Sequence, residues 1–126
     1  MSDRHTPALR AAALRAAVAL ERYELHVRRL AATWLDMELY RTVSAEIDEI
    51  KGHCACLPQF SVAWVSLLIS HSELIHCLWR STQAGNVVPW QERQRHLLDH
   101  IACIRVLADH CACFVPGEQD APCSQY

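Results

Sequence analysis

Apolar residues recur along residues 9–50 at spacings of three and four, which is the spacing of one face of an α-helix. Thr6 and Pro7 precede this run, and a hydroxyl followed by proline is typical of a helix start. Gly52 follows the run and is typical of a helix stop. The expected core positions are Leu9, Ala13, Ala16, Leu20, Tyr23, Val27, Leu30, Trp34, Met37, Tyr40, Val43, Ile47 and Ile50.

The run contains one irregularity near residues 33–40. Two successive spacings of three, from residue 37 to residue 43, replace the alternation of three and four that a regular heptad keeps. Thr33 and Asp36 have the spacing of a capping box, which favours a new helix start, although no glycine or proline supports it. The pattern leaves two alternatives: one long, locally overwound helix, or two helices with a break between them.

Two more stretches have helical spacing. They cover residues 58–84 and 89–115, and each opens on a proline and is followed by a glycine or proline stop. The sequence therefore predicts an all-α fold, an antiparallel bundle of three long helices, or of four if the first breaks near residues 33–40. We expect residues 1–115 to form this single domain and residues 116–126 to be a mobile tail.

Length and composition narrow the class of protein. The chain has 126 residues, enough for one domain, and 52% of them are apolar. Twelve Lys and Arg against fourteen Asp and Glu give a net charge of −2, so nucleic acid is not a favoured partner. The apolar window at residues 60–79 contains several serines and histidines, which favours a bundle helix over a membrane span. Seven cysteines, an odd number, favour free thiols in the cytoplasm.

A second apolar line follows the first helical stretch at steps of seven, roughly opposite the first line. Its members are Ala11, Val18, Leu25, Ala32 and Leu39. Two explanations remain open: either the helix lies at the centre of the bundle with both sides buried, or the second line contacts a partner. We favour the partner. The expected interface residues are Val18, Leu25 and Leu39, together with the arginine row Arg15, Arg22 and Arg29.

This interpretation predicts a small non-enzymatic helical protein that self-associates and acts by protein–protein interaction, as an adaptor, chaperone or inhibitor. The basic block at residues 4–29 and the acidic block at residues 36–49 are expected to face solvent and each other. The sequence has no phosphate-binding glycine loop, and no aromatic platform accompanies the arginines. The expected partner is therefore a protein.

The tetrapeptide His-Cys-Ala-Cys occurs twice, at residues 53–56 and 110–113. An antiparallel bundle places both copies at the same end, so that they can meet. Thiolates and imidazoles are ligands of zinc and of cuprous copper, which makes a metal- or redox-responsive protein the alternative function. The main interpretation needs no cofactor, because cysteines at helix ends are often simply buried. The alternative metal ligands are His53, Cys54, Cys56, His110, Cys111 and Cys113.

Weaker motifs lie on the last two helical stretches. Arg95 and His100 have the Arg-x4-His spacing that some small all-α ribonucleases use, which leaves enzymatic activity open but not favoured. Glu92, His96 and His100 are four residues apart on one helix face and offer another metal site, although the heptad count places both histidines on a solvated flank. His71 occupies a core position, where we expect a hydrogen-bonded histidine.

Overall fold

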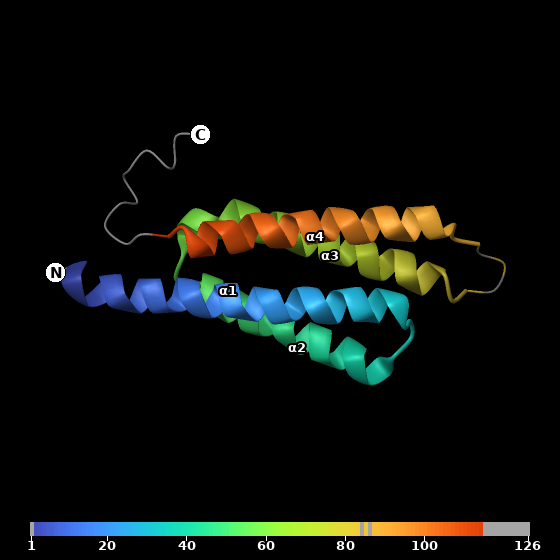
Figure 1. Ribbon diagram of the computed structural model, residues 1–126, viewed down its shortest axis with the longest axis horizontal. Coiled ribbons are helices and arrows are strands. Elements are labelled where there is room, and N and C mark those ends of the chain that lie inside the picture. Colours follow the sequence, from blue (N-terminus) through green and yellow to red (C-terminus); the bar gives the residue numbers. More distant parts are fainter. Residues whose placement is uncertain (1, 84, 86, 115–126) are drawn as a thin grey trace.

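The computed structural model of the protein describes residues 2–83, 85 and 87–114. This part of the chain forms four α-helices and one short 3-10 helix, without strands. The elements are α1 (Ser2–Ala32), α2 (Met37–Cys54), η1 (Pro58–Phe60), α3 (Ser61–Arg80) and α4 (Trp90–Ala112). In Figure 1, α1 and α2 form one layer, α3 and α4 form the other, and successive helices run in opposite directions. The predicted all-α bundle is confirmed, with the first stretch divided into two helices. The tail predicted at residues 116–126 lies outside the described residues.

The break between α1 and α2 is made by side chains at residues 33–36. The amide and the hydroxyl of Thr33 both donate to the carbonyl of Arg29, at 2.9 and 2.7 Å, and so close α1. The Asp36 carboxylate caps α2 by accepting a hydrogen bond from the amide of Leu39 at 3.1 Å. Asp36 is therefore the cap of the second helix, whereas Thr33 ends the first.

Two predicted helix boundaries are wrong. α1 begins at Ser2, so Pro7 lies inside the helix rather than at its first position. α2 continues through Gly52 as far as Cys54. Both residues lie within two turns of a helix end, where proline removes a single backbone hydrogen bond and glycine costs only about 1 kcal/mol. Packing of the helix against its neighbours overrides costs of this size.

The core lies between the inward faces of the helices. α1 packs on both α2 and α4, and α3 packs on α4, whereas α2 and α3 share only a small contact. All six predicted positions from Ala13 to Leu30 in α1 are buried, but Met37 at the start of α2 is 41% exposed. The buried residues of α1 are Ala12, Ala13, Ala16, Ala19, Leu20, Tyr23, Val27 and Leu30.

A chain of polar side chains crosses this apolar core. The hydroxyl oxygen of Tyr23 lies 2.6 Å from His71 Nδ1 and 2.7 Å from His100 Nε2. The other nitrogen of His100, Nδ1, lies 2.6 Å from the hydroxyl oxygen of Ser70, which donates to the carbonyl of Leu67 at 3.0 Å. Tyr23 and His100 are completely buried and Ser70 is nearly so, so the chain replaces the hydrogen bonds that these groups lose with water.

The serine fixes the direction of every hydrogen bond in the chain. Because Ser70 donates to a carbonyl, its oxygen accepts from Nδ1–H of His100. Nε2 of that ring then accepts from the Tyr23 hydroxyl, whose oxygen accepts from Nδ1–H of His71. These directions hold for neutral rings, and the lowered pKa of each histidine keeps both rings neutral at pH 7. Burial lowers the pKa of both, and burial together with His71 lowers the pKa of His100 to about 3.

These contacts confirm one histidine prediction and overturn another. His71 is the hydrogen-bonded core histidine that the sequence predicts. The prediction of a solvated His100 is wrong. α4 buries a broader face than the heptad count assumes, and this face places His100 beside Leu97 and Ile101.

α3 is the most apolar of the four helices. Together with η1 it forms one stretch, Pro58–Arg80, that is long and apolar enough by length and composition to cross a membrane. Within the bundle α3 packs on α4, as the interrupted apolar window predicts. It supplies the buried residues Leu67, Ser70, Leu74, Cys77 and Leu78 to the core.

Candidate functional site

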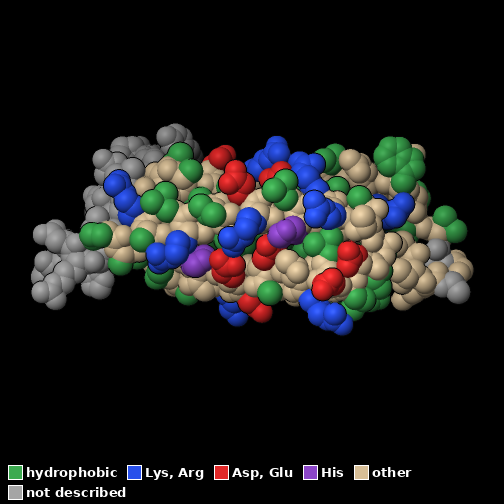
Figure 2. All heavy atoms as spheres, turned by 60° about the horizontal axis from the view of Figure 1, so that its bottom comes forward, with side chains coloured by type: hydrophobic (Ala, Val, Ile, Leu, Met, Phe, Trp, Pro, Cys, Tyr) green, Lys and Arg blue, Asp and Glu red, His purple; other side chains and the backbone are tan. Residues whose placement is uncertain are grey.

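The outer face of α1, which we define as Leu14, Val18 and Leu25, is uncovered. Val18 is 56% exposed and Leu25 is 65% exposed, on the side of the helix opposite its buried residues. This exposure excludes the first explanation, in which the bundle encloses α1 on all sides. Leu14 is 54% exposed and belongs to the same face, although the step of seven did not include it. Figure 2 shows exposed apolar side chains interspersed with charges of both signs over α1 and α2.

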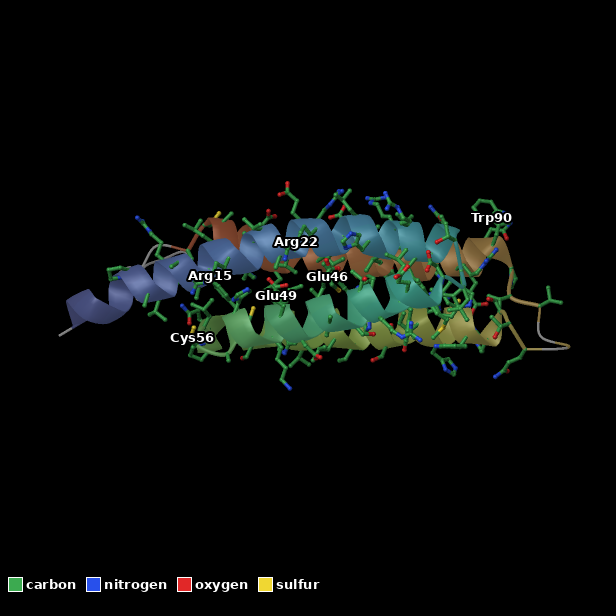
Figure 3. All side chains as sticks on the ribbon, turned by 90° about the horizontal axis from the view of Figure 1, so that it is seen from below. Arg15, Arg22, Glu46, Glu49, Cys56 and Trp90 are labelled. Atoms are coloured by element: carbon green, nitrogen blue, oxygen red, sulfur yellow. The ribbon has the colours of Figure 1, made fainter. Side chains whose placement is uncertain are left out.

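The predicted arginine row lies along one edge of this face. Arg15, Arg22 and Arg29 are all exposed. Nη2 of Arg22 lies 3.1 Å from the Glu49 carboxylate of α2, and Nε lies 3.9 Å from that of Glu46 (Figure 3). At Arg22 the basic and acidic blocks therefore face each other as predicted. Among the described residues, Arg15 and Arg29 form no ion pair.

The other edge of the face is acidic. Glu21 is exposed there, and next to it Glu24 pairs with Arg28 at 3.1 Å and with Arg105 of α4 at 3.0 Å. The hydrogen bonds from the two arginines lower the pKa of Glu24, so Glu24 is a carboxylate at neutral pH whose charge the two arginines balance. Glu21 is the acidic side chain of this edge that forms no ion pair among the described residues. The outer face of α1 thus has an arginine edge and a glutamate edge.

One predicted interface residue lies elsewhere. Leu39 belongs to α2, because the chain reverses at residues 33–36. It is partly buried and packs against the core. Leu39 is seven residues after Ala32, so it continues the sequence pattern. It does not continue the outer face of α1, because it lies on a different helix.

The two His-Cys-Ala-Cys segments meet at one end of the bundle, as the topology predicts. The buried thiols of Cys54 and Cys111 interact. The contact with Cys111 lowers the pKa of Cys54, while the same contact and burial raise the pKa of Cys111. Cys56 lies exposed just beyond α2 (Figure 3), and Cys113 is also exposed.

The remaining residues of these segments have other contacts. His53 pairs with Glu49 at 3.4 Å, and the ring of His110 stacks on Phe60 with 5.7 Å between centroids. Among the described residues, no third Cys, His, Asp or Glu joins Cys54 and Cys111 in a group of metal-binding size. A metal site at this end remains a prediction, and it would require these side chains to rearrange.

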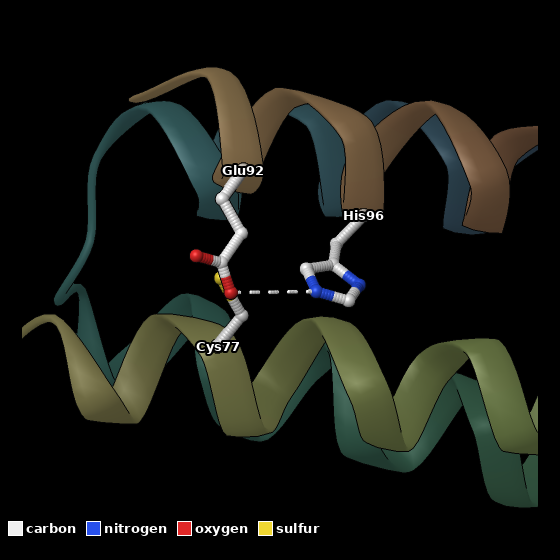
Figure 4. Close-up of side chains that lie close together, drawn as sticks. All are labelled: Cys77, Glu92 and His96. Atoms are coloured by element: carbon white, nitrogen blue, oxygen red, sulfur yellow. Dashed lines mark ion pairs between the residues drawn. The ribbon is translucent and has the colours of Figure 1, made fainter. Parts of the chain in front are cut away.

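A group of three metal-ligand types occurs at the opposite end of the bundle. Cys77 of α3 and Glu92 and His96 of α4 each place one donor atom within 4.8 Å of the other two (Figure 4). The sequence pattern found Glu92 and His96 but paired them with His100, which is buried in the core instead. It missed Cys77. One feature of the sequence could have indicated Cys77. Residues 77 and 92 lie at similar distances in sequence from Gly85, whose φ of 82° suits the turn between α3 and α4, so a turn there places the two residues at the same level of the bundle.

Arg80 is the main neighbour of this group. It forms a close ion pair with Glu92 and also interacts with Cys77. The Arg80 hydrogen bond lowers the pKa of Glu92, whereas burial raises the pKa of the Cys77 thiol. Glu92 is therefore a carboxylate at neutral pH, and Cys77 is a protonated thiol.

The ribonuclease-like pair does not form a site. Arg95 is exposed, whereas His100 is inside the core and is held by Tyr23 and Ser70. Both ring nitrogens of His100 are used in these bonds, so none remains to transfer a proton to a substrate. The Arg-x4-His spacing therefore does not bring Arg95 and His100 to a common surface.

Comparison with known protein families, with curated proteins and with solved structures finds no match to this chain. Its function is therefore inferred from its own side chains.

Proposed function

We propose that this protein is a helical module that acts by protein–protein interaction, and that it self-associates by pairing the outer face of α1 with the same face of a second copy. The observation that carries the proposal is the exposure of Val18 and Leu25 on the side of α1 that points away from the core. A row of aliphatic side chains in contact with water is a common mark of an interaction surface. Covering the row with an identical row removes both from water.

The two edges of the face favour a second copy over an unrelated partner, and they favour one orientation. When two helices pair in the same direction, the right edge of one meets the left edge of the other, so the arginine edge meets the glutamate edge. An antiparallel pair brings arginine to arginine. The α1 helices are therefore expected to pair in parallel, with Arg22 of one copy near Glu21 of the other. Each copy carries both an arginine edge and a glutamate edge, so two identical copies are complementary.

The apolar contact supplies most of the affinity. Burying a Val or Leu side chain contributes on the order of 1.5–3 kcal/mol, so each strengthens association by about tenfold or more. Exposed ion pairs contribute roughly 0–1 kcal/mol each and mainly select orientation.

The proposal is tested by replacing Val18 and Leu25 together with glutamate. We expect the parent chain to be a dimer by sedimentation equilibrium and the double variant to be a monomer with unchanged helix content. The matched control is Val62→Glu with Ile69→Glu on α3, which also replaces two exposed aliphatic residues. This control should remain dimeric. A monomeric parent chain, or a dimer that only the α3 variant dissociates, would show that the proposal is wrong.

Orientation has its own test. Leu25→Cys places a thiol at a position that meets its own copy only in a parallel pair. Under mild oxidation we expect a disulfide that joins the introduced thiols of the two copies, identified by mass spectrometry of the linked peptides. The charge test is Arg22→Glu, Glu21→Arg and the two combined. Each single change should weaken the dimer, and the combination should restore it.

A further inference from the structure

The turn-facing ends of α3 and α4 bring together a thiol, a carboxylate and an imidazole. Cys77 lies in the last turn of α3, Glu92 in the first turn of α4, and His96 one turn further on. Figure 4 shows Glu92 and His96 reaching from α4 across the space between the helices to Cys77. Because two packed helices supply the three side chains, the bundle itself fixes their positions.

We propose that Cys77, Glu92 and His96 bind a zinc ion. Thiolate, carboxylate and imidazole are all regular zinc ligands, and three protein ligands leave the fourth tetrahedral position to water. Magnesium and calcium take oxygen ligands, which a buried thiol does not offer. Cuprous copper favours thiolate, thioether and imidazole over carboxylate, so this donor set selects zinc.

The distances suit zinc after a small adjustment. Zinc lies about 2.0–2.3 Å from its ligands, which places the ligand atoms about 3.5 Å from one another in a tetrahedron. His96 Nε2 and Glu92 Oε2 are already 3.8 Å apart. All three donor atoms lie within 4.8 Å of one another, so about 1 Å of closure is needed, which is of the size that rotations about the side-chain torsions of the three residues supply.

Arg80 is compatible with the ion. One thiolate and one carboxylate cancel the charge of Zn²⁺, so the filled site carries no net charge that would repel a guanidinium. Arg80 already contacts the Glu92 carboxylate, which has two oxygens. Arg80 and His96 both approach the same oxygen, Oε2, so the carboxylate has to turn for one oxygen to bind zinc while the other keeps the arginine. The arginine then holds the carboxylate in place as outer partners of metal ligands do. Binding converts the Cys77 thiol to a thiolate and releases its proton to solvent.

The test uses the full chain, reduced and freed of metal with a chelator, and titrated with Co²⁺ as a spectroscopic substitute for Zn²⁺. We expect one Co²⁺ per chain, a near-ultraviolet thiolate-to-cobalt charge-transfer band, and loss of the band when Zn²⁺ is added. Cys77→Ser should abolish the band. His96→Gln should keep a thiolate band but weaken cobalt binding at least tenfold. Cys103→Ser, a half-buried cysteine of α4 outside the group, is the matched control and should bind as the parent does.

Two results would overturn the proposal. One is a parent chain that shows no thiolate band at all. The other is a band that survives Cys77→Ser but disappears in Cys54→Ser or Cys111→Ser, which would place the metal at the opposite end of the bundle. If Cys77→Ser fails to fold, as judged by its circular dichroism, the test uses His96→Gln, which changes a half-buried side chain. Cobalt binding as tight as in the parent chain would then overturn the proposal. Neither result bears on self-association, because the outer face of α1 contributes no ligand to this group.

Discussion

The two faces of α1 carry apolar residues at the same spacing, yet only one of them is core. On the inner face Ala16, Leu20 and Tyr23 are completely buried, whereas on the outer face Val18 and Leu25 remain more than half exposed. The faces differ in width. Buried alanines flank the inner line and let the neighbouring helices approach closely, whereas arginines and glutamates flank the outer line. The width of an apolar band, and not its period, therefore separates core from surface in this helix.

The largest expected contrast is between one leucine on each face. Leu20→Ala removes a fully buried side chain and leaves a cavity, so it should lower the free energy of unfolding by about 2–5 kcal/mol. Leu25→Ala removes an exposed side chain and should change the free energy of unfolding of the monomer by less than about 0.5 kcal/mol. Urea denaturation at equal, dilute chain concentration measures both. Equal losses would show that the outer face is covered by the chain itself.

The polar chain on the inner face predicts the next largest effect. Tyr23→Phe keeps the ring but removes the hydroxyl between His71 and His100, leaving a half-buried donor on His71 and a fully buried acceptor on His100 without partners. An unsatisfied buried group costs about 1–3 kcal/mol, so the free energy of unfolding should fall by at least that amount. Tyr40→Phe is the control, because its hydroxyl makes no hydrogen bond within the described part of the chain. Similar losses from the two variants would argue against the hydrogen-bond chain.

The same chain predicts a dependence of stability on pH. The pKa of His100 is about 3 in the folded protein and about 6.5 in the unfolded chain. Because the folded pKa is the lower one, the unfolded chain binds more protons between these values, and stability is lost as the pH falls from 6.5 towards 3. Acidification from pH 7 to pH 5 should cost about 2 kcal/mol through His100 alone. His100→Gln should reduce this loss when unfolding is measured at both pH values, and an unchanged loss would assign it to other groups.

The local parts of the fold follow from the sequence, whereas the parts that depend on pairing between helices do not. Asp36 begins α2 because its carboxylate reaches the amide of Leu39, three residues on, whereas Thr33 ends α1 at the carbonyl of Arg29. Both contacts are local, so the spacing of Thr33 and Asp36 in the sequence already favours the break. Leu39 and His100 were misplaced for a different reason. Whether Leu39 continues a face of α1, or His100 faces water, depends on which helix lies beside it, and this becomes visible only when α2 and α4 are placed.

The candidate sites show the same division. The repeated His-Cys-Ala-Cys segment is conspicuous in the sequence and its copies do meet, yet residues two apart on a helix diverge, and only Cys54 and Cys111 come together. Cys77 has no conspicuous motif, but it faces Glu92 across a turn. A repeated segment in an antiparallel bundle indicates that its two copies lie at the same end of the bundle. It does not indicate which of their side chains converge.

The smallest expected effect is at the arginine edge, where α1 contacts α2. Arg22→Gln removes an ion pair with Glu49 that is partly exposed on both sides, since the side chain of Arg22 is 49% exposed and that of Glu49 is 42% exposed. It also removes a longer contact of 3.9 Å with the buried carboxylate of Glu46, which keeps its closer partner His26 at 2.7 Å. Such pairs contribute roughly 0–1 kcal/mol and are screened by salt, so the loss of unfolding free energy should be small and should fade at high salt. Denaturation at low and high salt measures this, with Arg15→Gln as the control because Arg15 forms no ion pair among the described residues. A larger loss that persists at high salt would mean that Arg22 supports the bundle through the packing of its aliphatic stem against α2, and the edge of the outer face would then belong to the core.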